Sequence, residues 1–173
     1  MLLRQTILQK TLLLSILICM TTLVSHAQSD KVDKKAEKRA EIKNLVEGQN
    51  YVFIAQTAIP MGGRSRILSS DADLTVTRDA IVSYLPYFGR AYTPPIDPAK
   101  GGIQFTSKDF SYTLTPRKKG GWDIEIKPKD YRDVQRMYLN ISDNGSASLQ
   151  VTSTNRSPIS FNGTISTPPP KKN

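Results

Sequence analysis

Two pairs of acidic residues are the only candidates for acid–base or metal chemistry that spacing alone brings out. Asp123 and Glu125 lie two residues apart in an alternating stretch, so both side chains point to one face of a strand. Trp122 points to the opposite face, so we expect the two carboxylates to face water, without the raised pKa of a catalytic acid. Asp71 and Asp73 share a face in the same way, but no calcium-loop spacing accompanies them. We therefore expect no catalysis, no cofactor and no metal site.

A ring-rich segment, Tyr84–Tyr92, packs four aromatic rings into nine residues, YLPYFGRAY. Tyr87, Phe88 and Tyr92 offer flat faces on which a sugar or another ring could stack. Arg90 could hold a carboxylate or a phosphate through two parallel hydrogen bonds. We take these four side chains as the candidate ligand-binding residues.

The alternative for this segment is a packed corner rather than a binding platform. In that arrangement Tyr84 and Phe88 enter the core, and Arg90 stacks on one of the rings. Pro86 and Gly89 supply the bend. The two interpretations are compatible, because one ring can pack inward while its neighbour faces water.

A basic turn is the second candidate interaction site. Arg117, Lys118 and Lys119 stand together at a predicted hairpin tip, where they could bind an anionic envelope polymer or simply be solvated. The full chain has a formal net charge of +9, and the segment 1–27 holds two of its basic side chains and none of its acidic ones. The remaining charge of +7 suggests anionic glycans, lipid headgroups or acidic proteins rather than nucleic acid.

The N-terminal segment, residues 1–27, has the pattern of a secretory signal peptide. Arg4 and Lys10 precede an uncharged apolar run over residues 11–24, and Ser25-His26-Ala27 ends with small residues at the two positions that a signal peptidase reads. The apolar run is too short to span a bilayer. We expect cleavage near Ala27 and export to the periplasm or beyond.

The single cysteine and the single histidine of the chain, Cys19 and His26, both lie in this expected leader. A mature chain without either residue has no imidazole or thiolate for nucleophilic catalysis or for a zinc site. Lipidation of Cys19 is disfavoured because Ile18 occupies a position that calls for Gly or Ala.

Behind these residues the sequence predicts one mainly β (α+β) domain over residues 28–166, followed by a disordered tail over 167–173. Charged and alanine-rich residues predict a helix over about 31–48 that packs on the sheet and stops at Gly48. Alternating segments then predict an antiparallel meander, either an open barrel or a sandwich, with Asn144-Gly145 as its strongest hairpin turn. The expected strands are 51–55, 74–77, 80–84, 110–115, 122–127, 137–141, 147–151 and 159–165.

Several segments together resemble the family of small exported bacterial proteins known as domain of unknown function 4251. They are residues 84–92, 101–105 (GGIQF), 119–124 (KGGWDI), 147–151 (ASLQV) and 155–161 (NRSPISF). The resemblance implies a single domain exported to the envelope of a Gram-negative bacterium. It implies no activity, no cofactor and no catalytic residue.

The sequence therefore favours a binding or structural module of the cell envelope whose partner is a small molecule, a glycan or an envelope protein. A glycan hydrolase that works through two carboxylates is the first alternative, because such chemistry needs no imidazole. A domain that binds a protein partner through its basic turn and helix is the second. The sequence leaves the ligand and the oligomeric state open.

Overall fold

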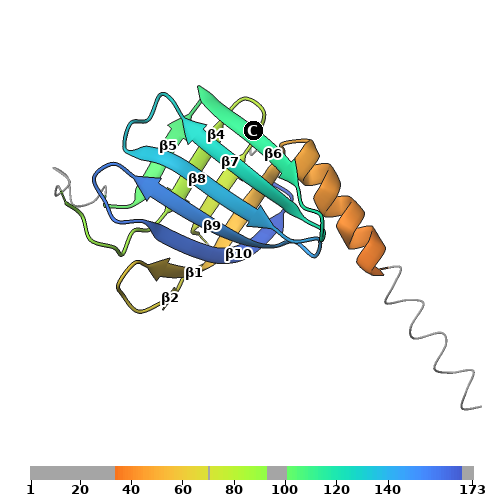
Figure 1. Cartoon of the computed structure of the whole chain (residues 1–173), viewed down its shortest axis with the longest axis horizontal. Coiled ribbons are helices and arrows are strands. Elements are labelled where there is room, and N and C mark those ends of the chain that lie inside the picture. Colours follow the sequence, from red (N-terminus) through yellow and green to blue (C-terminus); the bar gives the residue numbers. More distant parts are fainter. Residues whose placement is uncertain (1–33, 70, 93–100, 169–173) are drawn as a thin grey trace, which may run out of the picture. The chain divides into compact units, whose positions relative to one another are not determined.

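Figure 1 shows the computed structural model of the chain, which describes residues 34–69, 71–92 and 101–168. The chain divides into two compact units, Met1–Lys38 and Arg39–Asn173. Of the first unit, only the beginning of a helix that runs over residues 34–47 is described. The expected leader and positions 169–173 of the expected tail lie outside the described residues.

The second unit contains the rest of the helix and, within the described residues, ten strands. Successive strands are antiparallel neighbours or are joined by short turns, as the alternating sequence pattern predicts. The strands are β1 (Tyr51–Pro60), β2 (Arg66–Ile67), β3 (Asp73–Val76), β4 (Ile81–Leu85), β5 (Ile103–Ser107), β6 (Phe110–Pro116), β7 (Trp122–Pro128), β8 (Val134–Ile141), β9 (Ser146–Ser153) and β10 (Ile159–Ser166).

The strands form one nearly closed, barrel-like antiparallel sheet in the order β5-β4-β3-β1-β10-β9-β8-β7-β6, with β2 added beside β1. β1 is the long strand that joins the two halves. Its first half pairs with β3, its second half pairs with β2, and it pairs with β10 along most of its length. A bulge at Gln56 separates the two halves and lets the strand bend. The predicted fold class, with an open barrel as one of its two forms, is confirmed.

The interior of the barrel is filled by the side chains of alternate residues along each strand. Phe53, Leu139 and Phe161 are completely buried, and Trp122 and Ile124 lie on the core face as predicted. Burial of a large apolar side chain stabilises the fold by about 1.5–3 kcal/mol relative to exposure. The opposite side of each strand faces outward, and this is where any site on the sheet must lie.

The helix packs one apolar stripe against the barrel through its second half. Ile42 and Val46 are completely buried, and the backbone carbonyl of Val46 accepts a long hydrogen bond of 3.5 Å from the hydroxyl of Tyr112. The left-handed residue that ends the helix is Gln49, with φ of 49°, and not Gly48 as predicted. The amide of Asn50 donates back to the carbonyl of Leu45 at 3.1 Å, which closes the helix end in the usual six-residue loop. No helix among the described residues is both long and apolar enough to cross a bilayer.

Candidate functional site

The ring-rich segment connects the end of β4 to the loop before β10, and several of its polar groups are used in that connection. The hydroxyl of Tyr87 lies 2.9 Å from the backbone carbonyls of both Arg90 and Ser157, and 3.0 Å from the hydroxyl of Ser157. The amide of Arg90 donates to the Ser157 hydroxyl at 3.0 Å, and the amide of Ser157 donates to the carbonyl of Arg90 at 2.9 Å. Tyr87 therefore ties the segment after β4 to the loop before β10.

A second arginine, absent from the sequence-based candidates, completes this brace. Arg156 places its guanidinium over the Tyr87 ring and donates through Nη1 to the carbonyls of Gly101 and Gly102, at 2.7 and 3.1 Å. Its Nη2 lies 3.2 Å from Asp133 Oδ2. With only 11% of its side chain exposed, Arg156 is committed to the fold and is not free to bind a ligand.

The predicted corner is wrong in two details. Tyr84 and Phe88 do not enter the core: they are 54% and 37% exposed. Tyr84 faces outward because Leu85, its neighbour in the alternating strand, faces inward. The ring-stacking arginines are Arg156 on Tyr87 and Arg66, 4.8 Å above Phe88, rather than Arg90.

The binding-platform hypothesis for the segment remains a prediction. Tyr92 is 66% exposed and the side chain of Arg90 is exposed, but Tyr87 already uses its hydroxyl within the fold. Of the four candidates, Phe88, Arg90 and Tyr92 are therefore the ones that a ligand could reach.

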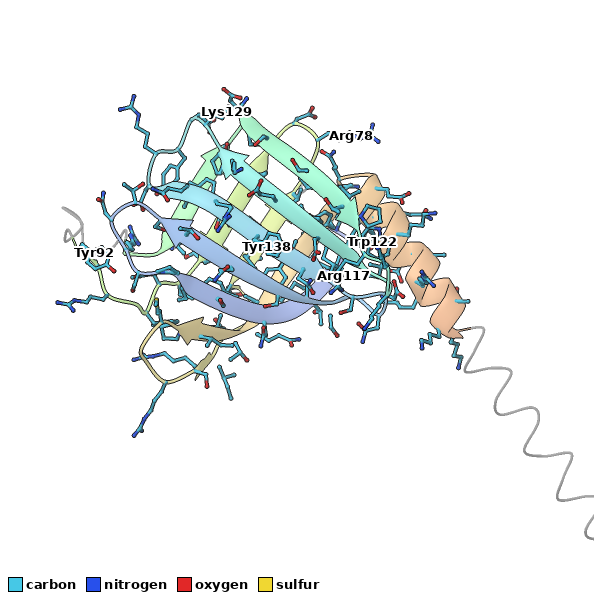
Figure 2. The ribbon with its side chains drawn as sticks, in the orientation of Figure 1. Arg78, Tyr92, Arg117, Trp122, Lys129 and Tyr138 are labelled. Atoms are coloured by element: carbon cyan, nitrogen blue, oxygen red, sulfur yellow. The ribbon has the colours of Figure 1, made fainter. Side chains whose placement is uncertain are left out.

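The basic turn after β6 does not act as a single patch. Arg117 folds back onto the sheet, where its Nη2 donates to the carbonyl of Ile141 at 3.1 Å and its Nε lies 3.8 Å from Asp123 Oδ1 (Figure 2). Lys118 and Lys119 are exposed. An anionic partner would therefore meet two lysines rather than three cations.

The carboxylate pair on β7 is engaged by neighbouring side chains. Asp123 accepts a 2.6 Å hydrogen bond from the amide of Asn140. Glu125 lies 2.7 Å from Lys127 Nζ and 3.7 Å from Arg136 Nη1. The hydrogen bond from Lys127 lowers the pKa of Glu125 from its ordinary value, so this group stays ionised and is a poor general acid. Among the described residues no group of three or more His, Cys, Asp or Glu side chains could hold a metal ion.

The outward side of β8, β9 and β10 is where uncharged polar side chains come together. We call this surface the polar face. Its side chains stand in two cross-strand rows, because the three strands pair in register. Adjacent strands are ~4.8 Å apart, so each row offers hydrogen-bonding groups at that interval. The first row is Asn140, Ser148 and Asn162, and the second is Tyr138, Gln150 and Ser160.

A shallow hollow of about 330 Å³ lies on the polar face around the first row. None of its lining residues is charged, and most carry a hydroxyl or an amide that can both donate and accept. The bulge in β1 contributes Gln56 to it, next to Gly163, where the missing side chain lets the backbone of β1 approach β10 closely. The lining residues are Gln56, Asn140, Ser142, Ser146, Ala147, Ser148, Asn162, Gly163 and Thr164.

One exposed ring stands beside this hollow. Tyr138, labelled over the sheet in Figure 2, is 38% exposed and neighbours Asn140 two positions along β8. Its partial desolvation, and then the nearby carboxylate of Asp123, raise its pKa above the ordinary value. The hydroxyl of Tyr138 therefore stays protonated and donates its proton to Asp123, so its oxygen can accept from a ligand and its ring face stays available.

Sequence reasoning missed the polar face because the face depends on strand register. The strands that contain Ser148 and Asn162 were predicted, but their alignment with Asn140 cannot be inferred from any one strand. One signal was available: the outward positions of residues 147–151 and 159–165 carry Ser, Gln, Asn and Thr and no charge. A solvated sheet face usually mixes in charged residues.

Comparison with known proteins gives a family and a fold. The family model described as Domain of unknown function (DUF4251) matches residues 33–165 of this chain. The crystal structure of a DUF4251 family protein from Bacteroides eggerthii, at 1.95 Å resolution, matches with a TM-score of 0.56 and 12% identity. The match covers 76% of this chain and 89% of that chain, and at this identity it shows the fold alone. No curated protein matches.

Proposed function

The chain belongs to the domain of unknown function family DUF4251, and we propose that this member is a non-catalytic binding module of the cell envelope. Its polar face holds a neutral, hydroxyl-rich ligand such as a glycan. The observation that carries the proposal is the uncharged hollow around Asn140, Ser148 and Asn162, which is built from three adjacent strands in register.

The chemistry of the hollow matches that of sugars. A sugar hydroxyl both donates and accepts, and the side-chain amides and hydroxyls of the hollow do the same. Gln150 and Tyr138 in the second row extend this surface, and the ring of Tyr138 can stack on the apolar side of a pyranose. Because the hollow has no charged lining, it offers an ionic ligand no counter-charge.

The engaged carboxylates favour binding over hydrolysis. A glycosidase needs one carboxyl group with a raised pKa as its acid and a second as nucleophile or base. On β7 the pKa of Glu125 is lowered, and Asp123 is hydrogen-bonded to Asn140 at the edge of the hollow. Asp123 thus orients the amide that a ligand would meet.

The expected leader supports a place in the envelope for this module. Export would carry residues 28–173 across the inner membrane and bring the polar face into contact with periplasmic or extracellular polymers. N-terminal sequencing of the protein recovered from the periplasm would test this step, with Gln28 as the expected first residue.

Binding can be tested by isothermal titration calorimetry against neutral and acidic oligosaccharides of matched length. We expect a neutral oligosaccharide to bind, and the double variant Ser148→Ala/Asn162→Ala to weaken that binding about tenfold, since each hydrogen bond contributes about 0.5–1.5 kcal/mol. The matched control is Gln104→Ala/Thr106→Ala, which removes an amide and a hydroxyl from exposed positions on β5. Binding of acidic oligosaccharides alone, or equal loss in both double variants, would contradict the proposal.

A further inference from the structure

A second surface lies on the hairpin that follows β1, next to the second row of the polar face, where Met61 shares a hollow with Gln150 and Ser160. We call residues 61–68 the β1–β2 arm. Two of its apolar side chains are far more exposed than is usual for their type: Ile67 is 92% exposed and Met61 is 70% exposed. At its base Arg66 and Ile67 pair with Ala58 and Thr57 of β1, and the amide of Leu68 donates to the carbonyl of Gln56 at 2.9 Å. In Figure 1 it projects from the lower edge of the sheet.

Arginines flank these apolar side chains. Arg64 and Arg66 lie on the arm and are exposed. The guanidinium of Arg66 lies 4.8 Å from the centroid of the Phe88 ring, which places Phe88 against the arm, and the exposed Arg90 follows two residues later in the chain. The segments 61–69 and 84–92 contain these three arginines and no Asp, Glu or Lys. The surface therefore combines exposed apolar groups with a local charge of one sign.

We propose that the β1–β2 arm, together with Phe88 and Arg90, docks the protein onto an anionic lipid surface. Met61 and Ile67 enter the boundary between headgroups and acyl chains, where burial of apolar groups is favourable. Arg64, Arg66 and Arg90 bind headgroup phosphates, and the long arginine stems let the charges remain at the interface. The proposal does not rest on the ligand of the polar face, because none of the docking side chains lines the hollow around Asn140, Ser148 and Asn162.

A bilayer fits this arm better than a protein partner does. A stable protein interface needs about 800 Å² of complementary surface on each side. The arm is a narrow projection, and a Cβ placed on Gly62 near its tip would meet no heavy atom within 4 Å. A lipid surface adapts its shape to such a projection and supplies the negative charge that the arginines require.

The test is flotation with lipid vesicles, using protein recovered from the periplasm, whose N-terminus is verified as identical in every variant by mass spectrometry. One set of vesicles contains phosphatidylcholine with a minority of phosphatidylglycerol, and the other contains phosphatidylcholine only. We expect binding to the anionic vesicles that weakens as salt is raised. Arg64→Gln/Arg66→Gln should weaken it about thirtyfold, since each arginine near such a surface contributes about fivefold. Met61→Ser/Ile67→Ser should weaken it at least about tenfold through loss of apolar burial.

The matched control, Val82→Ser/Arg132→Gln, changes one exposed apolar residue and one exposed arginine outside the arm and should bind as the wild type does. Urea unfolding of each variant verifies that the fold is retained. The proposal would be overturned if the wild-type protein did not bind the anionic vesicles. It would also be overturned if the wild type bound both vesicle types equally and the arm variants bound as the wild type does. Capture of an envelope protein through the arm without any vesicle binding would also overturn it.

Discussion

The guanidinium of Arg156 lies 5.2 Å from the centroid of the Tyr87 ring. The same guanidinium contacts Asp133 and the backbone carbonyls of Gly101 and Gly102, so one side chain joins the segment after β4, the start of β5 and the loop before β8. The ring-rich segment is therefore held in place by a residue that lies far later in the chain.

We expect Arg156→Lys to lower the free energy of unfolding by about 2–3 kcal/mol. A lysine cannot contact Asp133 and two carbonyls at once, and the groups it abandons are largely shielded from water. Urea unfolding followed by circular dichroism measures the change. Arg132→Lys, at an exposed position on the neighbouring loop, is the control and should change stability by less than about 0.5 kcal/mol. Equal effects at the two positions would show that Arg156 has no special role.

Two glycines with nearly the same positive φ should respond differently to a methyl group. Gly62 and Gly121 have φ of 82° and 80°, so alanine is strained at both, by about 1–2 kcal/mol. At Gly62 the added Cβ meets nothing within 4 Å, whereas at Gly121 it meets the backbone carbonyl of Ile141. We expect Gly121→Ala to lower the free energy of unfolding by at least about 2 kcal/mol more than Gly62→Ala. Similar losses in chemical denaturation would contradict the packing described at the β6–β7 turn.

Asp130 should titrate far below an ordinary aspartate. A 2.5 Å hydrogen bond from the Ser107 hydroxyl, and then the amide of Lys108, lower its pKa to about 2. Because the folded-state pKa is below the unfolded value of 3.8, this group stabilises the fold above about pH 4, and that contribution is lost as pH falls toward 2. NMR titration of the carboxyl carbon should show the pKa rise in Ser107→Ala and stay unchanged in Thr106→Ala. A wild-type pKa near 3.8 would contradict the hydrogen-bonding geometry.

The tyrosine pair at the helix end should make the fold sensitive to alkali. The hydroxyls of Tyr51 and Tyr112 lie 3.3 Å apart, and burial raises the pKa of Tyr112 to about 12 and that of Tyr51 well above 10. The unfolded chain loses these protons near pH 10 while the folded chain keeps them, so stability falls as pH rises from about 10 to 12. Tyr112→Phe should make the fall less steep, as measured by urea unfolding across that range. An unchanged slope would mean that the pair does not control the alkaline limit.

Local patterns predicted the parts of the fold that depend on alternation and turn chemistry. The alternation around Trp122 identified the buried face of β7, and Asn144-Gly145 identified the β8–β9 turn, where Gly145 has φ of 85°. The short strand β2 escaped notice because two residues carry no periodicity, and β5 because it follows a stretch rich in Pro and Gly.

The candidate site was harder to predict because it depends on long-range pairing. Tyr84 faces outward because Leu85 beside it is buried. The aromatic composition of the segment suggested instead that Tyr84 is the buried residue. The polar face depends on the mutual register of β8, β9 and β10, and the Arg156 brace on a contact between residues far apart in the chain. Neither property can be inferred from a local window of sequence.

The central claim is that a neutral hydroxyl-rich ligand binds on the polar face, and an NMR titration with a neutral oligosaccharide tests it most directly. The account predicts that amide and side-chain resonances of Asn140, Ser148 and Asn162 shift together, with Tyr138 and Gln150 at the edge of the affected region. Shifts confined to Phe88, Arg90 and Tyr92, or to the basic turn at Lys118 and Lys119, would contradict it.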